Sequence, residues 1–280
     1  MQNLFLLILI LYLLFLIRPA LSGQLGGIFK TTQVPMEYLE LREFITNQPE
    51  YFRTIWIPQS SKYSFYSSNY PLISGTGLLG NYSIDTVAKE LSKDSSRAVL
   101  EQASVRYIIV PYDHDGVIFL TDRMYDEKKY LKTISEIEKV SYVKEVEGFG
   151  KIKVFEVPNS KDHFFGTRQE LDISWVKKSS SEYSLSIKNA RKGEVLVFSE
   201  NFDKNWEASN VKLTYFQESI PYNKFFNSFI LPADGEYPIR VYYKPQNLVK
   251  KGIIISLMGV AIIVIISVYS LIKLRNGRKT

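Results

Sequence analysis

The sequence G-I-I-I-S-L-M-G-V-A-I-I-V-I-I-S-V-Y-S-L-I runs from Gly252 to Ile272 and contains no charged residue. As a helix, its 21 residues extend about 31 Å, at roughly 1.5 Å per residue, which matches the hydrocarbon core of a bilayer. The stretch therefore predicts a transmembrane helix over 252–272. This helix decides the class of the fold, because it attaches the rest of the chain to a membrane.

The charges that flank this stretch predict its orientation. Four basic residues and no acidic residue follow it, at Lys273, Arg275, Arg278 and Lys279, whereas only Lys250 and Lys251 directly precede it. Cytoplasmic flanks carry the excess of lysine and arginine. We therefore expect a cytoplasmic basic tail over 273–280 and a cell-membrane protein whose bulk is extracytoplasmic.

A second apolar run opens the chain. Leu4 to Ile17 are 14 consecutive apolar residues, and Met1 to Leu21 is interrupted only by Arg18 and Pro19. We expect a retained transmembrane helix over 1–21. The alternative is a signal peptide cleaved after Ser22, but the first three residues carry no positive charge. Both interpretations leave Gly23 to Lys251 outside the cytoplasm.

Charge and cysteine content exclude several classes of function. All 29 acidic residues lie between Gly23 and Lys251, together with 30 of the 35 basic residues, so this part of the chain is close to neutral. The formal charge of +6 thus reflects the membrane flanks and does not form a basic face, which argues against a nucleic-acid partner. The absence of cysteine excludes thiolate metal sites, cysteine nucleophiles and disulfides.

The extracytoplasmic part changes its pattern near residue 160. Over 22–160, helical periodicity alternates with apolar runs, as in the helix predicted after Pro35 and the strand predicted over Val105–Val110. This pattern predicts an α/β domain. Over 161–249, short alternating segments such as Tyr183–Ile187 and Tyr237–Tyr243 predict about six strands in an antiparallel β-sandwich. The expected fold class is therefore α+β and membrane-anchored, with a transmembrane helix at each end.

Few residues in the chain could carry chemistry. Asp113, His114 and Asp115 follow an apolar strand and are weak candidates for metal binding or acid–base chemistry, although a solvated Asp-Gly turn is the favoured interpretation. His163 lies in the expected linker without an evident partner. Gly75-Thr-Gly77-Leu-Leu-Gly80 has dinucleotide-binding spacing without the required context, so a loop and no cofactor are expected.

Several motifs, in order, resemble the C-terminal extracytoplasmic region of YfhO-like multi-pass membrane proteins. Val197-Phe-Ser-Glu-Asn-Phe-Asp-Lys-Asn-Trp-Glu-Ala208 resembles that family's S-E-x-Y-x-x-G-W-x-A phrase, and Phe229-Ile-Leu-Pro-Ala-Asp-Gly-Glu236 resembles its L-P-A-G-x-H turn. Val241-Tyr-Tyr-Lys-Pro245 resembles its F-x-Y-x-P strand. Asn205 replaces the usual glycine before Trp206, and Glu236 and Tyr237 replace the Gly-x-His ending.

The resemblance implies a link to GT-C-type glycosyltransferases, which transfer sugars from polyprenyl-phosphate carriers. Their catalytic carboxylates lie in early loops among many membrane helices, so no catalytic residue carries over to this chain. We expect a module, non-catalytic by itself, of a system that modifies cell-surface glycan or glycolipid, and Trp206 is the candidate substrate-binding residue. Its expected partners are the lipid bilayer, a multi-pass membrane protein or a membrane domain preceding this chain, and a polyprenyl-linked sugar or surface glycan.

Two alternatives belong to other classes. The first is a free-standing cell-envelope scaffold or carbohydrate-binding protein, in which the sandwich itself recognises glycan. The second is an extracytoplasmic hydrolase that uses Asp113, His114 and Asp115, which is the weakest of the three hypotheses.

Overall fold

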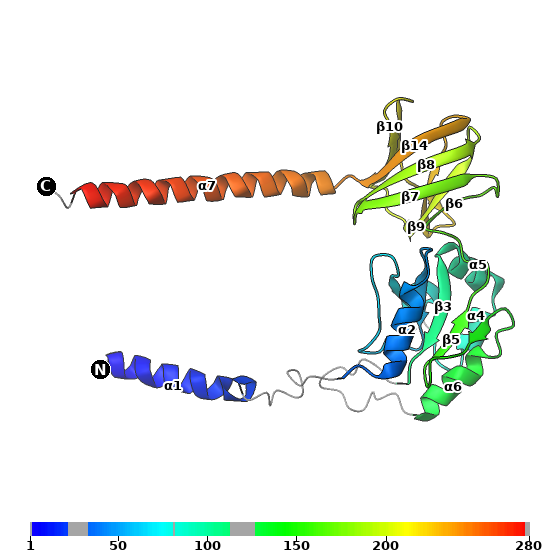
Figure 1. Cartoon of the computed structure of the whole chain (residues 1–280), viewed down its shortest axis with the longest axis horizontal. Helices are drawn as coiled ribbons and strands as arrows, with labels where there is room; N and C mark the ends of the chain where they lie inside the picture. The colour runs from blue at the N-terminus through cyan, green and yellow to red at the C-terminus, as the bar shows by residue number, and fades with distance from the viewer. Residues whose placement is uncertain (1, 22–32, 81, 113–126, 278–280) are drawn as a thin grey trace. The chain divides into compact units, whose positions relative to one another are not determined.

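The chain has an α+β fold that divides into two compact units. The computed structural model describes residues 2–21, 33–80, 82–112 and 127–277. The units are Met1–Ser160 and Lys161–Thr280, and each is described separately (Figure 1).

The first unit contains a five-stranded mixed sheet in the order β2-β1-β3-β5-β4. β1 pairs in parallel with β2 and β3, and β5 is antiparallel to β3 and β4. Its elements are α1 (Gln2–Leu21), α2 (Met36–Thr46), β1 (Arg53–Trp56), β2 (Leu72–Ser74), α3 (Gly75–Leu79), α4 (Val87–Leu91), α5 (Asp94–Gln102), β3 (Val105–Val110), α6 (Glu127–Ile137), β4 (Lys144–Val146) and β5 (Lys153–Glu156).

Helix α2 covers one face of this sheet, and its sequence periodicity explains why. Tyr38, Leu41 and Ile45 recur at helical spacing and are all buried against a cluster that includes Trp56 and Tyr107. The ring planes of Tyr38 and Trp56 are stacked, with centroids 6.4 Å apart. α4, α5 and α6 lie on the other side of the sheet (Figure 1). The predicted helix after Pro35 and the predicted buried strand Val105–Val110 are therefore confirmed.

Two local expectations in this unit were wrong. The stripe Ile84, Val87, Ala88 and Leu91 in the sequence predicts a helix capped by Ser83. α4 begins instead at Val87, because the Ser83 backbone N–H donates to the Thr86 hydroxyl (2.9 Å) in a turn. The glycine-rich segment expected to be a loop forms the short helix α3. A Cβ at Gly75 would lie 2.1 Å from the Tyr82 hydroxyl, so a larger residue at this position would require the Tyr82 side chain to move.

The second unit contains two antiparallel sheets. Their strand orders are β11-β10-β14-β8-β7 and β12-β13-β9-β6. The strands are β6 (Phe164–Gly166), β7 (Asp172–Ser179), β8 (Glu182–Ala190), β9 (Val195–Asn201), β10 (Trp206–Asn210), β11 (Tyr215–Glu218), β12 (Ile220–Tyr222), β13 (Phe226–Ile230) and β14 (Gly235–Tyr243).

These nine described strands exceed the six that were expected. Alternation marks β8 and β14, whose inward residues Leu185, Ile187, Ile239 and Val241 are all buried. β9 and β13 do not show this alternation, because consecutive residues are buried along each strand. β6 and β12 are three residues long, which is too short for any period to be recognised.

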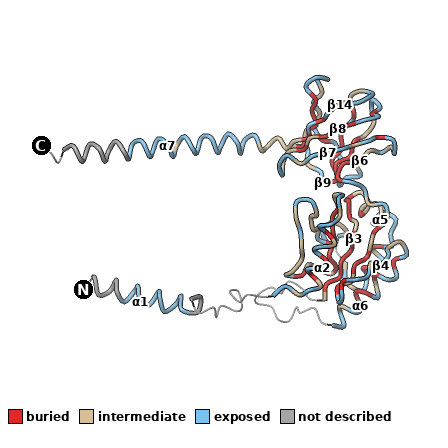
Figure 2. Tube along the Cα trace, viewed as in Figure 1, coloured by how far each residue is buried: buried red, intermediate tan, exposed pale blue. Residues whose placement is uncertain are grey.

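One core cluster in the second unit draws on both sheets (Figure 2). Phe164 and Phe198 from one sheet are stacked, with ring centroids 4.5 Å apart and planes 2° from parallel. Tyr183 from the other sheet packs edge-on against Phe198, with centroids 5.2 Å apart. Aromatic contacts of this kind fix the geometry of a core more specifically than aliphatic packing does.

Strand β14 leads into α7 (Gln246–Gly277), the one helix in the described part of the chain that is long and apolar enough to cross a membrane. Its isoleucines, valines and leucines are exposed from Leu248 to Ile266 (Figure 2). In α1, the described apolar stretch is Ile8–Arg18, which is shorter than a span, so the predicted transmembrane helix over 1–21 stays a prediction.

The packing of α2 yields a first prediction. Leu41→Ala is expected to destabilise the first unit by about 2–5 kcal/mol, because a buried leucine leaves a cavity. Leu39→Ala, on the exposed side of the same helix, is expected to change the unfolding free energy by less than about 0.5 kcal/mol. Hydrogen exchange of α2 and β1 peptides measures both effects, and equal protection in the two variants would contradict the packing described.

Candidate binding site

An open pocket of about 410 Å³ lies where β14 leads into α7. Three segments form it: the turn between β7 and β8, the loop between β9 and β10, and the end of β14. Its volume is within the range of small-molecule sites, roughly 300–1,000 Å³. The lining residues are Ser180, Ser181, Glu200, Asn201, Phe202, Asp203, Trp206 and Tyr243.

Trp206, the residue expected to bind substrate, begins β10 and lines this pocket. Its side chain is only 9% exposed and packs against Phe198 and Tyr243, at ring-centroid distances of 4.9 and 5.2 Å. Contact with a ligand would therefore be limited to one edge of the indole, and its role in binding stays a prediction. The most exposed aromatic ring of the pocket is Phe202, at 38%.

Asp203 organises the loop between β9 and β10. Its carboxylate accepts hydrogen bonds from the backbone N–H and the side-chain amide of Asn205 (2.9 and 2.8 Å) and from the Tyr243 hydroxyl (2.7 Å). The Asn205 backbone N–H, followed by the Tyr243 hydroxyl, holds the pKa of the Asp203 carboxyl below its usual value. The same bond to Asp203 raises the pKa of Tyr243. Asp203 is thus an ionised acceptor that links two walls of the pocket.

Asn227 on β13 holds this loop from beneath and is fully buried. Its side-chain NH₂ donates to the backbone carbonyls of Glu200 and Asn201 (2.9 and 3.0 Å). Its carbonyl oxygen accepts from the Asp203 backbone N–H (3.0 Å) and the Ser219 hydroxyl (2.9 Å). Both N–H groups and the oxygen of this amide are therefore paired. Three of its four hydrogen bonds go to residues 200–203 and hold the loop against β13.

The sequence analysis did not identify Asp203 or Asn227 as part of the site, although the sequence contains a weak signal for each. Asp203-Lys-Asn205 has the spacing of a turn in which a side-chain carboxylate accepts from the backbone two residues later. Asn227 and Ser228 interrupt the otherwise apolar segment Phe225–Ile230, which is typical of polar side chains buried with structural partners. Neither signal identifies the partner.

His163 lies in the expected linker and has no partner that is evident in the sequence, but in the structure it packs into the second unit. It is 1% exposed, among the rings of Phe164, Trp175, Tyr183 and Phe198. Its Nδ1 lies 2.9 Å from the Ser199 hydroxyl, and its Nε2 lies 3.7 Å from a carboxylate oxygen of Glu200. His163 therefore contacts the outer wall of the pocket through Glu200.

The other predicted site residues cannot be placed. Asp113, His114 and Asp115 lie outside the described residues. Within the described ranges, no group of three or more histidine, aspartate or glutamate side chains could hold a metal ion.

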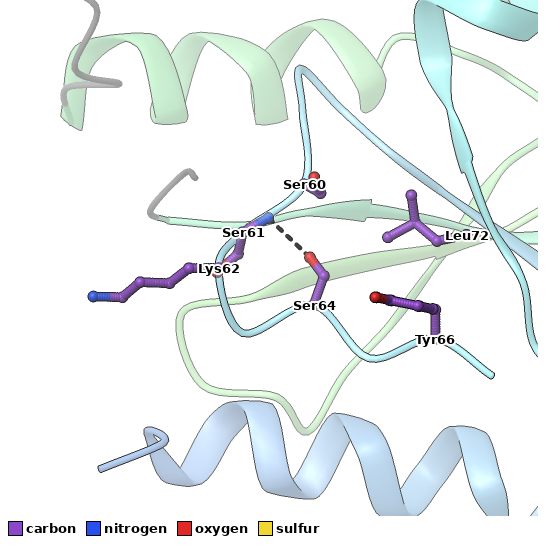
Figure 3. A pocket seen from close by; sticks show the side chains of 6 residues that line it. All are labelled: Ser60, Ser61, Lys62, Ser64, Tyr66 and Leu72. Carbon is purple, nitrogen blue, oxygen red and sulfur yellow. Dashed lines mark hydrogen bonds between the residues drawn. The ribbon is translucent and has the colours of Figure 1, made fainter. Parts of the chain in front are cut away.

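A second hollow, of about 360 Å³, lies in the first unit beside β2 (Figure 3). It is lined by Ser60, Ser61, Lys62, Ser64, Tyr66 and Leu72. Its hydroxyls are used locally: the Ser61 backbone N–H donates to Ser64 (2.8 Å), and the Tyr63 backbone N–H donates to Ser61 (3.1 Å). Lys62 extends away from the other five side chains, so they do not converge on a ligand position.

The pocket at β14 has the chemistry of a site for a polyhydroxylated ligand. Glu200, Asn201 and Asp203 offer oxygen acceptors, Ser180 and Ser181 offer hydroxyls, and Phe202 and Tyr243 offer ring surface. No lysine or arginine lines it.

Searches of protein-family models, curated proteins and solved structures find no match to this chain.

The hydrogen bonds of Asn227 generate a prediction about the loop. Asn227→Ala is expected to lower the unfolding free energy of the second unit by about 3 kcal/mol, because it strips partners from buried backbone groups. Asn247→Ala, at an exposed position of α7, is the matched control and should change it by less than about 0.5 kcal/mol. Thermal denaturation of the full chain in detergent tests the difference, and equal stability of the two variants would refute the role given to Asn227.

The lowered pKa of Asp203 predicts a pH dependence. Since the folded state favours the carboxylate, its stabilisation is present above the ordinary pKa of 3.8 and is lost as the pH falls through the lowered value. The difference in unfolding free energy between the wild-type chain and Asp203→Asn should therefore be constant near neutrality and shrink below pH 3.8. Urea titrations over this range measure it, and a pH-independent difference would contradict the assignment.

Proposed function

We propose that this chain is a membrane-anchored, extracytoplasmic carbohydrate-contacting module of a YfhO-like or GT-C-like system that modifies cell-surface glycan or glycolipid. It is non-catalytic by itself. α7 is its anchor, residues 273–280 are its cytoplasmic tail, and the two sheets of the second unit form a β-sandwich. The pocket where β14 leads into α7 is the ligand site.

One observation carries the proposal: acceptor oxygens and aromatic rings converge in a pocket three residues before the apolar helix begins. Sugars present many hydroxyl donors together with apolar C–H faces, which such a lining complements. A ligand on a lipid carrier, or on the cell surface, would be held close to the bilayer by this placement. The ordered motifs that resemble the YfhO-like region add support from the sequence, and two of them contain residues that line the pocket.

The anchor is supported by the exposure of α7. Its apolar side chains from Ile253 to Ile266 are more than half exposed, and they contact no other part of the described chain that could cover them. A helix that is apolar on all sides is stable only when lipid or another protein surrounds it. The excess of basic residues after residue 272 supports a cytoplasmic location for the C-terminal end of the helix.

A glycan array probed with the full chain in nanodiscs tests the binding site. We expect a hit among cell-surface saccharides whose dissociation constant rises at least tenfold, or about 1.4 kcal/mol, in Phe202→Ala and in Glu200→Gln. Phe216→Ala removes an exposed ring outside the pocket and is expected to bind normally. Trp206→Ala is unsuitable, because loss of so buried a ring would unfold the unit. No hit, or a hit that the two pocket variants bind normally, would contradict the proposal.

Purification from native membranes in mild detergent separates the two versions of the function. A stoichiometric multi-pass membrane partner supports the module of a larger system. Glycan binding by a chain that purifies alone supports the free-standing cell-envelope protein instead.

A further inference from the structure

The loops around the pocket share one end of the second unit with the start of α7, and backbone hydrogen bonds connect them. The Tyr243 and Lys244 backbone N–H groups donate to the carbonyls of Ser181 and Asn205 (2.9 and 3.0 Å). The Phe202 backbone N–H donates to the carbonyl of Phe225 (2.7 Å), which brings the turn between β12 and β13 to the same place. We call these loops, residues 179–182, 201–205 and 222–226, the helix-proximal end.

Apolar rings are exposed at the helix-proximal end. Phe202 is 38% exposed and Phe225 is 48% exposed, on adjacent backbone segments. Phenylalanine is normally buried, and aromatic side chains exposed beside a membrane anchor are typical of contact with the lipid interface. From Gln246 to Lys251 the helix rises only about 9 Å, at roughly 1.5 Å per residue, before the uncharged stretch begins.

The charges at this end are unequally paired. Three acidic groups near this end have close partners within the fold: Asp203 bonds to Asn205 and Tyr243, Glu218 pairs with Lys244, and Glu182 pairs with Arg240. A fourth, Glu200, lies 3.7 Å from Nε2 of His163. By contrast, Lys204 and Lys224 are exposed, and within the described residues neither forms an ion pair. Two lysines beside two exposed rings thus remain available for an external anion.

We propose that the helix-proximal end docks on the bilayer that holds α7, with Phe225 and Phe202 in the headgroup region and Lys204 and Lys224 on the phosphates of anionic lipids. Continuity with α7 brings these residues within reach of that surface, and the charges are complementary to it. Each lysine near an anionic surface contributes about 1 kcal/mol, which weakens as salt rises. Docking would hold the pocket at headgroup level and keep the second unit upright. The inference rests on the membrane anchoring of α7 proposed above.

The chain contains no cysteine, so a single introduced cysteine can carry a fluorophore. Ser180→Cys reports on the helix-proximal end, and Lys212→Cys reports on the opposite end, beyond the last residue of β10. The five residues of β10 separate these ends by about 17 Å, at roughly 3.3 Å per residue. Energy transfer to acceptor lipids in vesicles of phosphatidylcholine with phosphatidylglycerol measures the height of each fluorophore above the bilayer.

We expect strong energy transfer from position 180 and weak transfer from position 212. In Lys204→Glu/Lys224→Glu/Phe225→Ser the two efficiencies should converge, because the unit then tilts freely on the segment before α7. The matched control makes the same kinds of change at exposed positions away from this end: Lys188→Glu, Lys192→Glu and Val211→Ser. It should keep the difference. Apart from Ser180, which carries the fluorophore in each chain compared, none of the substituted residues lines the pocket. The vesicles contain no glycan, so the result does not depend on glycan binding.

Two outcomes would overturn the docking. One is equal transfer from both positions in the wild-type chain. The other is a difference that survives the triple substitution, or that is as large in pure phosphatidylcholine at about 0.5 M salt, where charge attraction is screened. Flotation of the chain with vesicles is measured first: failure to float refutes the anchor of the proposed function, whereas flotation without a height difference refutes the docking alone.

Discussion

The buried side-chain amide of Asn227 is the constraint on which the architecture of the pocket depends. An amide placed among core aromatics must find partners for its NH₂ and its carbonyl oxygen, because leaving them unpaired costs more than the bonds return. Asn227 finds them in the backbone of residues 200–203 and in Ser219. If the loop between β9 and β10 moved away from β13, the buried amide of Asn227 would therefore lose its hydrogen-bond partners.

From this loop, the hydrogen bonds continue toward the start of α7. Asp203 accepts from the Tyr243 hydroxyl, and the neighbouring Lys244 backbone N–H donates to Asn205. Tyr243 and Lys244, which precede α7, are thus bonded to the loop that carries Phe202 and Asp203. In the function that we propose, ligand contact and membrane contact would share this set of bonds, which gives a physical reason for a binding pocket at this end of the unit.

Sequence patterns recovered the parts of the fold that local spacing encodes. The buried face of α2, with Tyr38, Leu41 and Ile45, and the inward residues of β8 and β14 follow directly from periods of 3.6 and 2. His163 and Asn227 were not recoverable, because their partners lie 36 and about 25 residues away and depend on how two strands register. The burial of Trp206 was not recoverable either. The exposed fraction of its side chain depends on the packing of Phe198 and Tyr243 against it, which the local sequence does not encode.

Net charge illustrates the same distinction between composition and arrangement. Between Gly23 and Lys251 the two signs almost cancel, so composition predicts no electrostatic preference for that region. In the structure, the acids near α7 are engaged with Asn205, Lys244 and Arg240, while Lys204 and Lys224 have no ion pair among the described residues. A region of near-zero total charge therefore presents two exposed lysines and two exposed aromatic rings at the end from which α7 begins. Pairing within the fold, and not the number of charged residues, determines which charges remain available to a membrane.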